Sequence, residues 1–178
     1  WSRDGRVRAD IINIAPDVAG LVVEVAVRDN QQVAKGDLLL RIDPAHYRLA
    51  VQQAEALLAA RQAALAMRTV NARRRADMDD LVVSRESRED AGYLAAAALA
   101  EYRQAQAQLE AARLDLQRTE VRATVAGYIT NLSVFVGDYV RVGEASMALV
   151  DSGSFYVNGY FEETRLPLRV NVLSLVIF

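Results

Sequence analysis

The sequence predicts an elongated α+β protein in which a β-sandwich is divided in the sequence by an inserted antiparallel helical hairpin. Three observations lead to this prediction. A strand-forming motif occurs twice, about 75 helix-forming residues separate its two copies, and a further strand-rich segment follows the second copy. The predicted parts are a sandwich, a hairpin and a piece of another β domain, which cover residues 10–43 plus 120–151, 44–119, and 1–9 plus 152–178.

The repeated motif reads V-A-G, a strand, a turn and then V-x-x-G. Its first copy begins at Val18 and ends at Gly36, and its second begins at Val125 and ends at Gly143. The spacing between equivalent positions is the same at the start and at the end of the motif, so the two copies align without a gap. Both copies are rich in β-branched residues and bounded by turn residues, which is typical of strands. We interpret them as two halves of one β module that meet in space.

Two long stretches between the copies favour helices. Residues 44–78 contain no glycine and no proline after the first position, and 87–119 are similarly rich in alanine and other helix formers. At about 1.5 Å per residue, each helix would be about 45–50 Å long. Asp43 is the expected N-cap of the first helix and Pro44 its first residue.

The two helices are expected to pack against each other as an antiparallel coiled coil. The second helix carries small and apolar residues in alternating steps of three and four, a heptad pattern: Ala95, Ala98, Tyr102, Ala105, Leu109, Ala112 and Leu116. The first helix offers a less regular seam, on which Arg61 and Arg68 also fall: Tyr47, Val51, Ala54, Leu58, Leu65 and Ala72. The short connection, 79–86, favours antiparallel neighbours.

Composition excludes several classes of function. The net charge is −2 and the pI about 5.5, so no basic surface for nucleic acid is indicated. There is no cysteine and only one histidine, His46, which disfavours thiol catalysis, zinc–thiolate sites and Ser-His-Asp triads. The sequence contains no run of about 20 apolar residues, the length that spans a bilayer. Because the chain begins at Trp1 rather than Met, we expect a fragment that lacks an upstream signal or anchor.

The two half-motifs resemble those of biotinyl/lipoyl domains, in which two such halves interlock into a flattened β-sandwich. With a long helical insertion between the halves, the chain is similar to the HlyD-type membrane fusion proteins. The segments that carry this resemblance are 14–22, 27–39, 42–44, 114–123 and 155–164. The last of these resembles the opening of the family's β-barrel domain, so 1–9 and 152–178 are expected to form part of a barrel. Residues 170–178 are expected as a core strand.

The resemblance implies a non-catalytic periplasmic adaptor. It would link an inner-membrane transporter to a TolC-type outer-membrane channel, export drugs or aromatic acids, and associate with further copies of itself. Within the family, 4–10 and 161–164 look most like the adaptors of aromatic-acid exporters, followed by those of major-facilitator pumps. The resemblance also implies an inner-membrane anchor in a segment missing from this chain. A carrier domain with a prosthetic group and a structural coiled-coil scaffold are the alternatives.

The hairpin tip is the first candidate site. Adaptors that dock onto TolC-type channels carry an Arg, a Leu and a Ser around the helical turn. Arg75, Leu81 and Ser87 lie close to that spacing, although Arg75 is one residue off and Asp80 occupies the usual leucine register. The alternative is that Ser87 is simply the N-cap of the second helix, with Asp90 completing a partial capping box.

A second candidate is the charge run Arg73-Arg74-Arg75, followed by Asp77, Asp79 and Asp80. It could match charges on a channel, and the alternative is a solvated helix end.

Neither a cofactor nor catalysis is expected. Lys35 lies in the turn that both halves share, whereas the family of lipoyl and biotin carriers modifies a lysine on the hairpin that the helices replace here. Glu162 and Glu163 are neighbours on an expected strand, so they point to opposite faces and cannot form an acid–base pair easily.

Overall fold

The structure is a computed structural model that describes residues 5–79 and 84–159. Leu81, Asp80, the Glu162–Glu163 pair and the expected strand at 170–178 lie outside these described residues. The chain divides into two compact units. One is a β unit drawn from the residues up to Ile42 and from Glu120 onward, and the other is a helical unit, Asp43–Thr119.

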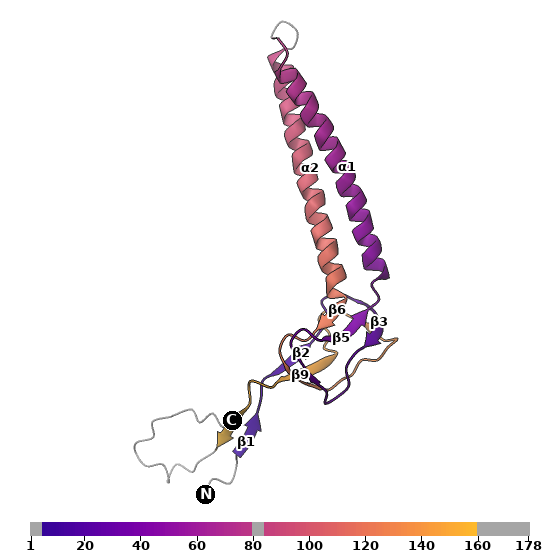
Figure 1. Cartoon of the computed structure of the whole chain (residues 1–178), viewed down its shortest axis with the longest axis vertical. Helices are drawn as coiled ribbons and strands as arrows, with labels where there is room; N and C mark the ends of the chain where they lie inside the picture. The colour runs from indigo at the N-terminus through magenta and orange to yellow at the C-terminus, as the bar shows by residue number, and fades with distance from the viewer. Residues whose placement is uncertain (1–4, 80–83, 160–178) are drawn as a thin grey trace, which may run out of the picture. The chain divides into compact units, whose positions relative to one another are not determined.

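The helical unit contains α1 (Ala45–Ala76) and α2 (Arg85–Arg118). The strands of the first part of the β unit are β1 (Gly5–Arg8), β2 (Ile11–Ile14), β3 (Gly20–Val25), β4 (Gln32–Val33) and β5 (Leu38–Ile42). Those after the helices are β6 (Glu120–Arg122), β7 (Gly127–Thr130), β8 (Tyr139–Val140), β9 (Met147–Asp151) and β10 (Tyr156–Gly159). Figure 1 shows the strands drawn from both ends of the chain, with indigo and orange strands side by side.

The sandwich consists of two four-stranded antiparallel sheets, in the orders β2-β9-β7-β4 and β6-β5-β3-β8. Strands β1 and β10 form a separate two-stranded sheet. At the constant spacing between the two copies of the motif, β7 is the equivalent of β3 and β8 is the equivalent of β4. Each strand and its equivalent occupy the same place in different sheets. Each half of the sequence thus contributes strands to both sheets. This confirms that the two copies of the motif form one sandwich, which the helices interrupt in the sequence.

The backbone hydrogen bonds repeat with the same offset. The Gly36 N–H donates to the carbonyl of Ala123 at 2.8 Å, and the Gly143 N–H donates to that of Pro16 at 3.0 Å. Both glycines have positive φ, 94° and 77°, a conformation that costs side-chain-bearing residues strain. The V-x-x-G ending of the motif therefore reflects a left-handed turn needed twice.

The glycine of V-A-G has a different role, because it allows a close approach. A Cβ on Gly20 would lie 2.6 Å from Cγ2 of Ile42, and one on Gly127 would overlap the carbonyl oxygen of Val150. These glycines occupy equivalent places in β3 and β7. Each lets its strand lie against a neighbour that a side chain would displace.

The core of the sandwich repeats as well. Ten of its buried apolar residues form five pairs related by the same offset, each residue at most 7% exposed: Val22 and Ile129, Val27 and Val134, Val33 and Val140, Leu40 and Met147, Ile42 and Leu149. Side chains inside alternate with outward-facing ones along β3, as a half-buried strand requires. Burying these residues supplies the main driving force for joining the two halves.

The hairpin packs along the predicted seam. On α2 the buried residues are Ala91, Ala98, Ala105 and Leu109, and the predicted seam positions that are not among them are half-buried. The apolar seam of α1 is half-buried, whereas Arg61 and Arg68 are exposed. Arg61 Nη1 lies 2.8 Å from Glu101 Oε2, and Arg113 Nη2 lies 3.1 Å from Glu55 Oε1. The residue that comes earlier in α1, Glu55, pairs with the residue that comes later in α2, Arg113. This order confirms that the two helices are antiparallel.

The start of α1 differs slightly from the prediction. Pro44 takes the N-cap position and makes no side-chain capping bond, so Asp43 precedes the cap. The Asp43 carboxylate still accepts a hydrogen bond from the Ala45 N–H at 2.9 Å. Asp43 therefore supplies an acceptor to the first turn from one position further upstream, and the helix begins one residue later than expected.

Candidate docking site at the hairpin tip

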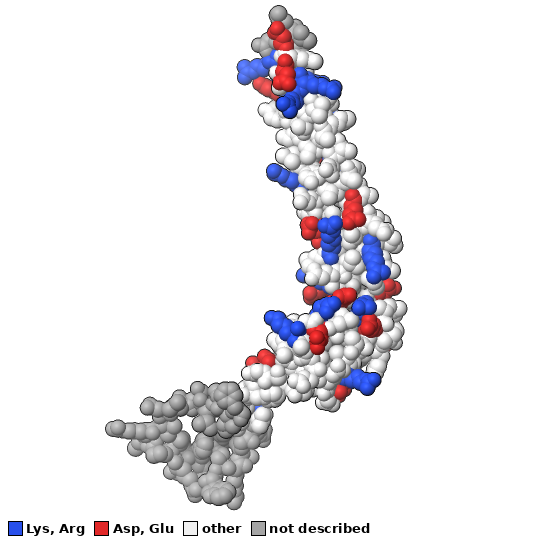
Figure 2. Space-filling model, viewed as in Figure 1, with Lys and Arg blue, Asp and Glu red and all other residues white. Residues whose placement is uncertain are grey.

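The tip of the hairpin is formed by the last turn of α1 and the first turn of α2. Basic residues crowd the end of α1, with Arg73, Arg74 and Arg75 in its last turn. Figure 2 shows positive and negative side chains gathered at this end of the hairpin, with a long uncharged stretch beside them. The tip is thus the most highly charged part of the hairpin that this face displays.

Two of the three predicted tip residues contact each other. Arg75 Nη1 donates to both the carbonyl oxygen and Oγ of Ser87, each at 3.2 Å. Arg75 comes from the end of α1 and Ser87 from the start of α2, so the bonds cross the hairpin. The structure therefore brings Arg75 and Ser87 together, while Leu81 lies outside the described residues.

The alternative, in which Ser87 is the N-cap of α2, is wrong because Ser84 is the N-cap. Ser84 has extended backbone angles (φ −62°, ψ 151°), and its Oγ accepts a hydrogen bond from the Ser87 N–H at 3.2 Å. Ser87 instead lies in the first turn, where its hydroxyl meets the Arg75 guanidinium. An N-cap accepts from the N2 or N3 amide, so the S-x-x-S spacing of 84 and 87 could have revealed this arrangement.

Arg88 is a tip residue that sequence reasoning missed. Its Nε donates to the carbonyl of Arg75 at 3.2 Å, and its Nη2 donates to the carbonyl of Met78 at 2.6 Å. Carbonyls at a helix C-terminus lack intrahelical donors, and a cation there also complements the helix dipole. Arg88 therefore ties the start of α2 to the end of α1. Nothing in the spacing of the sequence shows which α2 cation faces these carbonyls.

One residue of the charge run at the end of α1 has a structural role. Asp77 is the C-cap of α1, and its backbone N–H donates to the carbonyl of Arg73 at 3.0 Å. The side chains of Arg73, Arg74 and Asp77 are exposed. They are therefore open to a partner on the surface of the tip.

Within the described residues, His46 and Lys35 are not assembled into a chemical site. The ring of the exposed His46 meets that of Tyr47 edge-on, with centroids 5.8 Å apart. Lys35 is exposed in the turn before Gly36. Across residues 5–79 and 84–159, no three potential ligands are grouped to hold a metal, and no helix is long and apolar enough to cross a membrane.

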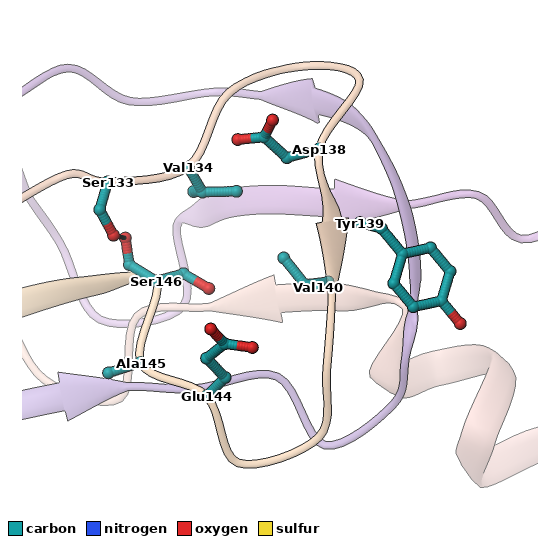
Figure 3. Close-up of a pocket in the computed structure, with 8 residues that line it drawn as sticks. All are labelled: Ser133, Val134, Asp138, Tyr139, Val140, Glu144, Ala145 and Ser146. Carbon is teal, nitrogen blue, oxygen red and sulfur yellow. Dashed lines mark hydrogen bonds between the residues drawn. The ribbon is translucent and has the colours of Figure 1, made fainter.

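The sandwich has a polar hollow where its two halves differ. It measures about 230 Å³, and Figure 3 shows the side chains around it: Ser133, Val134, Asp138, Tyr139, Val140, Glu144, Ala145 and Ser146. Ala145 and Ser146 occupy the places that Leu38 and Leu39 fill in the first half. Ser133 Oγ donates to the carbonyl of Ser146 at 3.0 Å. The small side chains of Ala145 and Ser146 thus leave room for the hollow.

Comparison with known proteins decides the family. The family model of the barrel-sandwich hybrid domain of RND membrane fusion proteins matches residues 10–152. This chain is a membrane fusion protein. It is also 45% identical over 166 residues to the uncharacterized protein YdhJ of Escherichia coli (strain K12). The match covers 93% of this chain and 58% of YdhJ, so the chain spans little more than half the length of that relative.

Two solved structures share the fold of this membrane fusion protein. MacA from Actinobacillus actinomycetemcomitans superposes with a TM-score of 0.76 at 19% identity, covering 90% of this chain and 55% of MacA. The periplasmic adaptor protein EmrA superposes with a TM-score of 0.62 at 17% identity, covering 90% of this chain and 78% of EmrA. The predicted fold, a split sandwich carrying a helical hairpin, is confirmed.

Proposed function

We propose that this membrane fusion protein is a non-catalytic periplasmic adaptor that links an inner-membrane transporter to a TolC-type outer-membrane channel. The observation that carries the proposal is the helical hairpin inserted into the sandwich, ending in a charged and hydrogen-bonded tip. Ion pairs and an alanine-lined seam hold the two helices together. Such a hairpin offers its tip, rather than a pocket, as a binding surface.

At the tip, Arg75, Leu81 and Ser87 are the proposed docking residues. Arg75 and Ser87 come from different helices and are joined at 3.2 Å, so a channel helix would meet the cation and the hydroxyl as one surface. A guanidinium keeps several donors beyond the two that Ser87 receives, and charge-assisted bonds to channel carboxylates or carbonyls are the strongest that it can make. Leu81 enters this proposal from the sequence alone.

The transporter partner is proposed from the resemblance of the sequence. An aromatic-acid exporter is the first choice and a major-facilitator pump the second, with drugs or aromatic acids as exported compounds. The fold shared with EmrA, a periplasmic adaptor protein, supports the adaptor role. We further propose that the protein is held at the inner membrane by a segment outside this chain, that copies associate, and that β1 and β10 belong to a barrel part, 1–9 plus 152–178.

An export assay with tip variants tests the proposal. Ser87→Arg and Leu81→Asp are expected to abolish export in cells that depend on this protein. Gln106→Arg is the matched control, because it adds the same charge at an exposed position of α2 away from the tip. Circular dichroism of the purified variants checks that the helices persist. Wild-type export by both tip variants would refute tip docking.

A further inference from the structure

The hollow of the sandwich is polar because equivalent places in the two halves carry different side chains. In the first half, Leu39 fills its place and is 0% exposed. In the second half, a hydroxyl or a carboxylate replaces an apolar or neutral side chain at three places. The pairs are Ala26 and Ser133, Gln31 and Asp138, and Leu39 and Ser146. All three second-half residues line the same hollow of about 230 Å³ (Figure 3).

The loop before β8 does not account for the charge of Asp138. In the first half, the Arg28 N–H donates to the side-chain oxygen of Gln31 at 2.9 Å. In the second half, the Phe135 N–H donates to the carboxylate of Asp138 at 2.8 Å. A neutral amide therefore satisfies the same loop bond, and the negative charge is an addition of the second half.

The carboxylate of Glu144 is also free of the task that its equivalent performs. In the first half, Asp37 accepts a hydrogen bond from the Ala34 N–H at 2.8 Å and so closes its own turn. Among residues 5–79 and 84–159, the partner of the Glu144 carboxylate is the exposed Arg141, whose Nη1 lies 3.9 Å away. Figure 3 shows the longer Glu144 side chain directed into the hollow. This carboxylate is therefore open to a ligand there.

Ser146 supplies a buried hydroxyl that no described residue bonds. The residue is 5% exposed. Its N–H donates to the carbonyl of Ile14 at 2.9 Å, and its own carbonyl accepts from Ser133. Within the described part of the chain, its Oγ has no hydrogen-bond partner, and Figure 3 shows this hydroxyl directed into the hollow near Glu144. Because buried hydroxyls are nearly always hydrogen-bonded, the partner of this one is expected inside the hollow.

The lining defines the chemistry of a ligand. The carboxylates of Asp138 and Glu144 only accept hydrogen bonds, and Val134 and Val140 add apolar wall. In the described residues no three potential ligands are grouped to hold a metal. A primary ammonium complements this lining, because it carries three N–H donors and makes charge-assisted bonds to carboxylates. The hollow is smaller than the pockets of about 300–1,000 Å³ that take drug-sized ligands, so its ligand is a small molecule.

We propose that this hollow binds a small primary alkylamine. Its ammonium group donates to the carboxylate of Glu144 and to the hydroxyl of Ser146, while Val134 and Val140 contact its methylene groups. Asp138 adds a second negative charge to the site. Because Asp138 precedes β8 and Glu144 follows it, the bound amine would connect the loops on both sides of this strand. The proposal goes beyond the adaptor role and does not depend on the channel or the transporter.

Titration of the purified chain with butylamine, followed by the backbone amide signals of residues 133–146 in NMR spectra, tests the proposal. Glu144→Gln keeps the shape of the side chain and removes its charge, and it is expected to weaken binding by about 10-fold or more. Ser146→Ala removes the hydroxyl and should weaken binding by about 3-fold or more. Glu110→Gln is the matched control, because it removes the same charge at an exposed position of α2 and should bind as wild type does.

A filled hollow gives an independent check. Ala145→Leu with Ser146→Leu introduces the residues that the first half carries at these places, Leu38 and Leu39, and leaves both carboxylates present. This double variant should lose butylamine binding, and the dispersion of its amide signals shows whether the sandwich is folded. If it does not fold, the two single variants decide the question. The neutral 1-butanol should bind wild type at least about 10-fold more weakly than butylamine.

Three outcomes would overturn the inference. Unchanged amide signals in the wild-type chain throughout the titration would show that the hollow takes no amine. Binding at wild-type strength in both Glu144→Gln and Ser146→Ala would place the amine elsewhere. Displacement of butylamine by calcium chloride, with shifts of the same amides, would identify a metal-ion site instead. The export assay on the tip variants tests the adaptor role separately from all three.

Discussion

Replacing Gly127 by alanine tests the reason for the V-A-G motif. The new Cβ would overlap the carbonyl oxygen of Val150, a backbone atom of the central strand β9. Neither strand can yield without loosening the bonded pairs of Gly127 with Asp151 and Tyr128 with Val150. Over-packing a tight interior costs about 1–3 kcal/mol, and because backbone must move here we expect a loss of about 3 kcal/mol.

Two other glycines make the expectation quantitative. Gly20→Ala places its Cβ 2.6 Å from a methyl group of Ile42, which can shift more easily than backbone, so a smaller loss of about 1–2 kcal/mol is expected. Gly92→Ala meets nothing within 4 Å in the middle of a helical stretch, and it should stabilise α2 by about 1 kcal/mol. The expected order of stability is therefore Gly92→Ala, wild type, Gly20→Ala, Gly127→Ala.

Hydrogen exchange is the suitable assay because the chain has two compact units. The amides of Val22 and Ile129, in β3 and β7, report on the β unit, while urea unfolding followed by circular dichroism reports mainly on the helices. Gly127→Ala should speed exchange of both β amides, and Gly92→Ala should leave them unchanged. Wild-type protection of Ile129 in Gly127→Ala would refute the close-approach explanation.

Further predictions concern the hairpin and the turn lysine. Ser84→Ala should destabilise the start of α2 by about 1 kcal/mol in urea unfolding, because it removes the N-cap acceptor, whereas Ser87→Ala should cost less. Ala105→Leu over-packs a seam position that is 2% exposed and should cost about 1–3 kcal/mol, while Ala107→Leu at an exposed position should be nearly neutral in the same experiment. Lys35 should be unmodified by intact-protein mass spectrometry of material from its natural host, and an added lipoyl or biotinyl mass would favour a carrier instead.

The fold was largely predictable because its signals are local or periodic. The constant spacing between the two copies of the motif predicted two interlocking halves, and the burial of Ala98, Ala105 and Leu109 follows the heptad steps. The role of Gly20 was not visible, since it depends on Ile42, a residue of a neighbouring strand. Periodicity within an element can be read from a sequence, whereas close contacts between elements require their register.

At the tip, too, features within one helix could be predicted, whereas contacts between the two helices could not. The alternative of an N-cap at Ser87 is wrong because Ser84 and Ser87 both fit a helix start, and the composition of the sequence places the first residue of α2 two positions late. The bonds from Arg75 to Ser87 and from Arg88 to Met78 cross the hairpin. They depend on how the two helices are staggered, which a heptad pattern constrains only to within a turn.

Cross-linking from the tip tests the adaptor role most directly. Because the chain has no cysteine, Ser87→Cys provides a single attachment point for a photoreactive maleimide, and Gln53→Cys in α1 provides an exposed control away from the tip. In cell envelopes that contain a TolC-type channel, illumination should join position 87 to the channel and leave position 53 unlinked to it. Cross-links to the channel from position 53 but none from 87 would contradict an adaptor that docks through its hairpin tip.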